Sequence, residues 1–424
     1  MKNPTKIAKI IAITVAIVCS LLFAVRMRQE SYQFKDVPGL IWGADLTLYF
    51  STLNKVYQHQ IPGIDFFVEY PPLAPLGWLT LPLLAKAHSE YDFIRFLYYQ
   101  NAFVAWILLT FSGYVLLKKN PNSVSNIVAI LSLASGLWIV RYLIVARFDI
   151  LPATLLTIVL LGYQYSDKIK MGAGQLILYW LSVAIKIYPI VMAPAIFRGY
   201  TSLSQAKKLI WTALLILAIH IPFFLLGFKN ILEFLNYHSA RNIEIGSTWA
   251  YIGLNMNFSG SEIHNNFGSC NFDGQAYKIL GKLAMPLILV LTAAFWYGVI
   301  RKIQDLKENL GLVAMVLLSI FIVLGKVWSP QYMLWFVALF PLIRCRLWIQ
   351  IAVSACILTA SWCAYTVAFT NFPNSTVDKD PYVMGLFLMK ILCVVTCAGL
   401  CLFELMKRRE HREILPAVLS PEYA

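Results

Sequence analysis

The chain has 424 residues, of which 59% are hydrophobic and only 13% are charged, whereas soluble domains carry about 25% charged residues. This composition excludes an ordinary soluble enzyme and predicts an all-α integral membrane protein, because helices satisfy every backbone polar group in lipid. The formal net charge of +14 is first explained by Lys and Arg on cytoplasmic loops, so nucleic acid is not an expected partner.

The first apolar run covers residues 7–25, and three basic residues lie before it or at its start: Lys2, Lys6 and Lys9. Residues 25–28 lack the small-residue pattern of a signal-peptide cleavage site. We therefore expect a retained membrane span whose N-terminal end is cytoplasmic.

A polar stretch at about 26–72 follows this span and contains Asp45, Asp65 and Glu69 before it ends at Tyr70-Pro71-Pro72. An acidic loop directly after the first span is where a membrane enzyme would hold a base that faces outward. We therefore expect this stretch to form a first outer loop that contributes to a functional site.

Further apolar runs predict about twelve crossings of the hydrocarbon core, which is roughly 30 Å thick. They are expected at 8–25, 97–117, 124–142, 150–165, 172–185, 188–198, 208–227, 280–300, 309–325, 330–343, 347–369 and 383–405. The stretch 73–85 contains Pro75 and Pro82 and is expected to be re-entrant or interfacial. The alternative is a full crossing, which would invert the loops that follow.

The charges of the loops set the expected orientation. Basic residues gather in the expected inner loops, for example at Lys118-Lys119 and Arg301-Lys302, and in a cytoplasmic tail at about 406–424. The two longest polar stretches, about 26–72 and 228–279, then face outward. Residues 1–424 are expected to form a single transmembrane domain.

Several ionisable residues lie at the outer ends of the expected spans, among them Arg147, Asp149, Lys186 and Lys326. Ionisable groups near membrane depth are costly unless they are paired or face a wet cavity. Their position on one face predicts a shared extracytoplasmic cavity. The alternative is that pairs such as Arg147 with Asp149 only pin helix ends.

The eight cysteines form no C-x-x-C pair, and the six histidines are scattered without the spacing of metal ligands. We therefore expect no metal site and no cofactor.

Six short motifs occur in a fixed order between about residues 40 and 335. They are Asp45-Leu46-x-x-Tyr49, Asp65-Phe66-x-x-Glu69-Tyr70-Pro71-Pro72-Leu73, Arg147-Phe148-Asp149-x-x-Pro152, Lys186-Ile187-Tyr188-Pro189, His238-x-x-Arg241 with Ser247, and Trp328-Ser329-Pro330-Gln331-Tyr332. By these motifs and their order, the chain resembles glycosyltransferase family 87, the polyprenyl-phosphomannose-dependent α-mannosyltransferases of the GT-C superfamily. The last two expected spans match only in general hydropathy.

The resemblance implies a GT-C-type helical bundle that uses a lipid-linked sugar, inverts its anomeric configuration and has Asp45 as its catalytic base. A carboxylate suits this role because it accepts the proton of the attacking hydroxyl, while a departing phosphate needs cations rather than an acid. Asp65 and Glu69 are rivals for the base. The alternative for these two, and for Tyr70, is a role in acceptor binding or in hydrogen bonds that order the loop.

The cations expected around the donor phosphate are Lys186, His238 and Arg241, with Arg147 as a fourth. Arg offers a fork to phosphate oxygens and Lys a point charge. The alternative for His238 is an ordinary interfacial histidine.

The sequence thus predicts transfer of a hexose, with mannose as the first candidate, from a polyprenyl-phosphate donor to a lipid or glycan acceptor. The reaction is expected on the outward face of a multi-pass protein surrounded by membrane lipids, by default in a bacterial plasma membrane. The alternative is a transporter or flippase of lipid-linked sugars, which needs polar groups on both sides of a midplane site. The polar residues favour one side, which favours an enzyme.

Overall fold

The computed structural model describes residues 43–120, 123–166, 171–198, 202–258, 262–369 and 379–418, together with residues 14, 17, 18 and 21. The expected span at 8–25, apart from these four positions, and the part of the first outer loop before Gly43 lie outside the described residues.

Six described helices are long and apolar enough to cross a membrane. They are α4 (Glu90–Lys119), α10 (Leu203–Leu226), α13 (Gln275–Gly298), α14 (Leu306–Leu324), α16 (Leu347–Phe369) and α18 (Pro381–Val418). Helices α10 and α13 expose large apolar side chains such as Trp211, Leu215 and Leu289, as lipid-facing helices do. The protein is an all-α membrane protein, as the composition predicts.

Shorter apolar segments coincide with other expected crossings. They are α5 (Val124–Ile139), α7 (Ile150–Gln164), α8 (Ala173–Ile185), the pair η2 (Tyr188–Met192) and α9 (Ala193–Phe197), and the series η4 (Pro330–Tyr332), α15 (Met333–Ala338) and η5 (Phe340–Leu342). Each is shorter than the roughly 20 residues of a straight transmembrane helix. The expected number of twelve crossings therefore stays a prediction.

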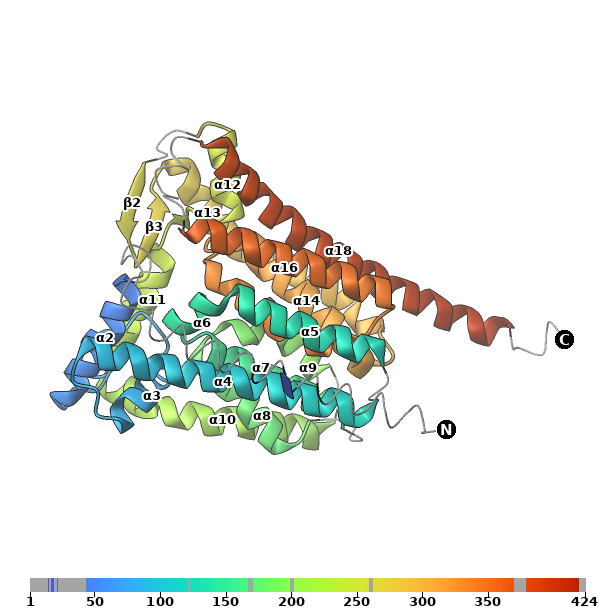
Figure 1. Cartoon of the computed structure of the whole chain (residues 1–424), viewed down its shortest axis with the longest axis horizontal. Coiled ribbons are helices and arrows are strands. Elements are labelled where there is room, and N and C mark those ends of the chain that lie inside the picture. The colour runs from blue at the N-terminus through green and yellow to red at the C-terminus, as the bar shows by residue number, and fades with distance from the viewer. Residues whose placement is uncertain are drawn as a thin grey trace.

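The core lies between the long helices. Helix α16 packs along α18, α14 also packs on α18, and α5 packs on α16. Figure 1 shows these helices running alongside one another, with the C-terminal part of α18 extending beyond the bundle. Side chains from Asn309 to Ser319 are all buried, so α14 is the central helix.

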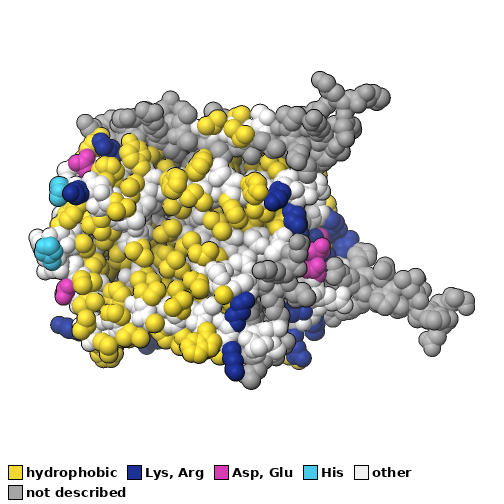
Figure 2. All heavy atoms as spheres, turned by 90° about the horizontal axis from the view of Figure 1, so that it is seen from below, with side chains coloured by type: hydrophobic (Ala, Val, Ile, Leu, Met, Phe, Trp, Pro, Cys, Tyr) yellow, Lys and Arg dark blue, Asp and Glu magenta, His cyan; other side chains and the backbone are white. Residues whose placement is uncertain are grey.

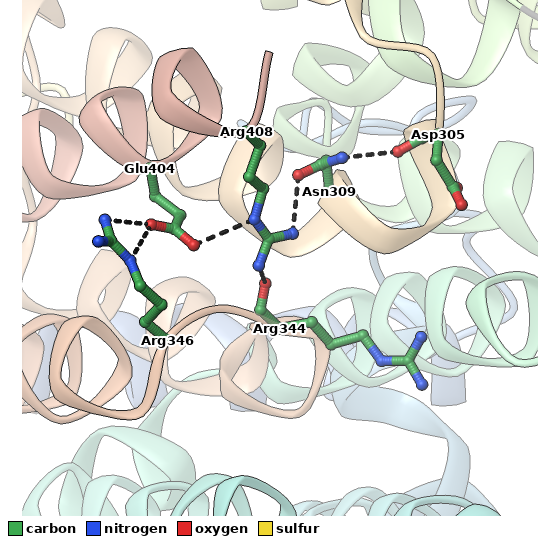
Figure 3. Close-up of polar contacts among 6 residues, drawn as sticks. All are labelled: Asp305, Asn309, Arg344, Arg346, Glu404 and Arg408. Atoms are coloured by element: carbon green, nitrogen blue, oxygen red, sulfur yellow. Dashed lines mark hydrogen bonds and ion pairs between the residues drawn. The ribbon is translucent and has the colours of Figure 1, made fainter. Parts of the chain in front are cut away.

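Charged side chains fasten α18 to its neighbours near that end of the bundle (Figure 3). Glu404, which is 3% exposed, accepts hydrogen bonds from Arg346 Nε at 2.8 Å and Arg408 Nε at 3.1 Å. Arg408 also donates to Asn309 Oδ1 at 3.0 Å and to the Arg344 carbonyl at 2.8 Å. The buried carboxylate is thus paired; it links α18 to the loop before α16, and Arg408 links α18 to α14.

The opposite end of the bundle carries the short elements. They are α2 (Gly43–Tyr57), α3 (Leu76–Leu84), α6 (Arg141–Ala146), α11 (Phe228–Ala240), α12 (Thr248–Asn255), and the strands β1 (Ile243–Glu244), β2 (Ile263–Asn266) and β3 (Ser269–Phe272). The strands form an antiparallel sheet in the order β1-β3-β2. With nine residues, α3 is about 13 Å long and too short to cross.

The polar stretches 26–72 and 228–279 are expected from the sequence to be loops, but their described parts contain helices and a small sheet. Figure 2 shows hydrophobic side chains over the middle of one face, with charged side chains toward its two ends. The charges at one end lie over the short elements, and this end contains the site described next.

Candidate functional site

A cavity of about 530 Å³ opens among the short elements and beside α13 and α14. It contains seven of the eight side chains that the sequence singles out: Asp45, Glu69, Tyr70, Arg147, Lys186, His238 and Arg241. These residues come from segments far apart in the chain, so the fold brings them together. The eighth, Asp65, is exposed and accepts a hydrogen bond from the Ile61 N–H at 2.6 Å, which orders its own loop.

Asp45 lies in the first turn of α2 and is 6% exposed. On the same helix, Leu46, Tyr49 and Leu53 are at most 5% exposed and pack into the core. This apolar face fixes α2 against the bundle and holds the carboxylate at the cavity wall.

Arg147 forms an ion pair with Asp45 and lies between α6 and α7. Burial lowers the pKa of Arg147 to about 10, so the guanidinium remains charged at neutral pH. The pairing of Arg147 with Asp149, one of the alternatives in the sequence analysis, is wrong: the two side chains pair with Asp45 and Lys186 respectively. Arg147 and Asp149 are close in sequence, but at the start of α7 their side chains reach partners on different segments.

Lys186 donates to Asp149 Oδ1 at 2.7 Å, and Trp335 Nε1 donates to the same oxygen at 2.8 Å. Asp149 is 0% exposed. The ammonium of Lys186 also lies 4.8 Å from the ring centre of Phe148 and 5.7 Å from that of Tyr70, distances at which a cation is attracted to an aromatic face. Lys186 is therefore a cation held in place from several sides.

Glu69 lines another part of the cavity and contacts α11. Its carboxylate accepts a hydrogen bond from the Tyr237 hydroxyl, and its backbone oxygen lies 3.0 Å from His238 Nε2. Gly268 borders this carboxylate at the tip of the β2–β3 hairpin, where Phe267 and Gly268 have φ angles of 51° and 64°. Positive φ at both central residues is the requirement of a type I′ turn, which matches the twist of the strands.

Two more cations complete the cavity. Arg241 Nη2 donates to Ser269 Oγ at 2.7 Å, while its buried Nε has no hydrogen-bond partner within the described part of the chain. Lys326 donates to the carbonyls of His238 and Arg241, each at 2.7 Å. Burial lowers the pKa of Lys326 to about 8.

Lys326 is expected from the sequence among the polar residues on the outer side, but without a role in the site. The signal was its position just after α14, at the expected outer end of an apolar run and two residues before the Trp328 motif. Glu244 was missed entirely. Its buried carboxylate accepts from the Trp328 N–H at 2.8 Å and from Ser329 Oγ at 2.9 Å, so it holds this motif beside the cavity.

Ser247, which belongs to one of the six motifs, lies outside the cavity lining and caps α12 by accepting from the Ala250 N–H at 3.1 Å. It therefore supports the fold rather than the cavity wall.

The charge of the lining is unbalanced. Four basic side chains, Arg147, Lys186, Arg241 and Lys326, line the cavity with only two carboxylates, those of Asp45 and Glu69. Arg147 and Lys186 are paired with Asp45 and Asp149. Arg241 and Lys326 form no ion pair with a carboxylate within the described part of the chain, so these two cations can attract an anion such as phosphate, which both Arg and Lys bind.

These features define a membrane-embedded protein with a cationic, partly apolar cavity at one end of its helical bundle. Comparison of the chain with protein-family models, with curated proteins and with solved structures gave no match.

Proposed function

We propose that the protein is a membrane glycosyltransferase that moves a hexose, first of all mannose, from a polyprenyl-phosphate donor to a lipid or glycan acceptor. One observation carries the proposal: a single cavity joins the Asp45 carboxylate, four cations and an apolar wall. The motif resemblance to family 87 of the GT-C superfamily supports the same assignment.

The cations suit the donor phosphate. Arg241 has a buried Nε without a partner among the described residues, and Lys186 and Lys326 contribute ammonium groups to the same cavity. Together they would hold the phosphate and stabilise the charge that grows on it as the bond to the sugar breaks.

The apolar wall suits the lipid part of the donor. Helix α13, one of the six helices able to cross a membrane, contributes Gly281, Ala284, Met285 and Ile288 to the cavity lining. A donor whose phosphate lies among the cations would therefore place its first isoprene units against α13, a helix able to lie within the hydrocarbon core.

The reaction needs one base. The acceptor oxygen forms a bond to the anomeric carbon, the bond between that carbon and the phosphate oxygen breaks, and the electron pair leaves with polyprenyl phosphate. The acceptor proton passes to a carboxylate, and we assign this role to Asp45. Donor phosphate would compete with Asp45 for Arg147, so binding of the donor would free the base.

The number of membrane crossings and the orientation of the chain are part of the same proposal. If the shorter apolar segments also cross, they would give about twelve crossings together with the six long helices and the expected span at 8–25. The basic residues at the end opposite the cavity would then be cytoplasmic, and the cavity would face outward from the plasma membrane.

Transfer by the purified protein tests the proposal. Proteoliposomes are supplied with radiolabelled polyprenyl-phosphate mannose or glucose and with extracted membrane lipids. We expect labelled glycolipid, which a flippase would not form. Absence of labelled product with every donor and acceptor, together with movement of intact donor across the bilayer, would favour the transporter instead.

Donor affinity tests the cations. Arg241→Ala should weaken binding by about tenfold to a hundredfold, the worth of one charge-assisted hydrogen bond, and Arg241→Lys should recover only part of it because the fork is lost. The matched control is Lys229→Ala, which removes an exposed cation of α11 outside the cavity. Equal affinity in Arg241→Ala and the control would show that Arg241 does not bind phosphate.

A further inference from the structure

A second hollow, with a volume of about 770 Å³, lies between α9 and α13. Its walls are apolar and include Pro194 and Phe197 from the α9 side and Leu289 and Ala293 from α13. On α13 its lining residues follow those of the cationic cavity along the chain. It is therefore a separate groove nearer the other end of the bundle.

Two arginines stand at one end of this groove. Arg198 directly follows α9, and Arg301 lies in η3 (Ile300–Lys302) just after α13. Among the described residues, neither guanidinium forms an ion pair with a carboxylate. Two cations at the mouth of an apolar groove are thus left for an external anion.

The dimensions and the flanking side chains match one leaflet of a membrane. Residues 289–298 of α13 span about 14 Å at a rise of 1.5 Å per residue, which is close to half of a hydrocarbon core of roughly 30 Å. Trp296 and Tyr297 are both exposed just before Arg301, and the Arg301 guanidinium lies 5.2 Å from the Tyr297 ring centre. Aromatic and basic residues in this order mark the level of lipid headgroups.

We propose that this groove is a binding site for an anionic phospholipid, with the lipid phosphate between Arg198 and Arg301 and an acyl chain along Leu289 and Ala293. A zwitterionic lipid brings a second cation into the same space and is disfavoured. The site does not depend on the proposed transferase activity, because no residue of the cationic cavity takes part in it.

Lipid retention in nanodiscs tests the proposal. The delipidated full-length protein is reconstituted with equal amounts of phosphatidylglycerol and phosphatidylcholine, and lipids that remain bound in native mass spectrometry are counted. We expect phosphatidylglycerol to be retained at least about fivefold over phosphatidylcholine. The double variant Arg198→Gln/Arg301→Gln should lose this preference. Lys207→Gln/Lys302→Gln, which removes two exposed cations that do not line the groove, should keep it.

A groove-filling variant separates a built site from general surface charge. Ala293→Trp leaves both arginines in place but occupies the groove, and we expect it to lose the bound lipid as well. Equal retention of both lipids by the wild type, or the same loss in the lysine control as in the arginine variant, would overturn the proposal. So would displacement of phosphatidylglycerol by millimolar inorganic phosphate alone, which would indicate a free-anion site.

Discussion

The buried pair of Asp149 and Lys186 gives the sharpest stability prediction, made with Asp149→Leu. The carboxylate accepts two hydrogen bonds, at 2.7 Å from Lys186 and 2.8 Å from Trp335, and each bond to a charged group is worth about 1.5–3 kcal/mol. Leucine removes the oxygen that accepts both bonds and leaves the ammonium of Lys186 buried without its partner. Breaking a buried pair in this way costs about 3–5 kcal/mol.

At about 2 °C per kcal/mol, the value for a large domain, the melting midpoint should fall by about 6–10 °C. The midpoint is measured on detergent-purified protein by size-exclusion chromatography with tryptophan fluorescence after heating. The double variant Asp149→Leu/Lys186→Met should recover at least half of the loss, because no uncompensated charge remains. A single variant within 2 °C of the wild type, or a double variant no more stable than the single one, would refute the reasoning.

Three further predictions concern the site and its orientation. Because burial lowers the pKa of Lys326 to about 8, its ammonium is lost as the pH rises through 8, and the affinity for polyprenyl-phosphate hexose should fall on the order of tenfold between pH 7.5 and 9.5; Lys326→Met should flatten this profile, and an unchanged slope would exclude the assignment. Gly268→Ala adds a methyl group at a φ of +64°, which costs about 1–2 kcal/mol and should lower the melting midpoint, whereas Gly174→Ala, which meets no atom within 4 Å, should not. In a background without native cysteines, a cysteine at Asn266 should react with an impermeant thiol reagent on intact cells and one at Gln304 should not, and the reverse pattern would invert the proposed topology.

Hydropathy predicts most of the helices because apolar runs are local features of the chain. The expected crossings at 124–142, 150–165 and 172–185 coincide with α5, α7 and α8 to within a few residues. A shared cavity could be expected from charge, since ionisable residues at the ends of apolar segments are costly unless they are paired or face a wet space.

Other features are invisible to such reasoning because they depend on contacts between distant segments. Asp45 pairs with Arg147 rather than remaining a free carboxylate, and Asp149 pairs with Lys186 across the cavity wall. Similarly, the β2–β3 hairpin lies in a polar stretch without strong alternation, and its central strand β3 pairs with both β2 and the distant β1.

The central claim is that Asp45 is the base of a transfer reaction, and one comparison tests it most directly. Transfer rate and donor binding are measured on the same purified Asp45→Asn variant. Asparagine keeps the size of the side chain but cannot accept the proton, so turnover should fall about a hundredfold or more. Donor affinity should be kept or should rise, because Arg147 loses the carboxylate that competes with phosphate. Near-normal turnover with normal binding would contradict the account and move the role of base to Glu69, the other carboxylate of the cavity lining.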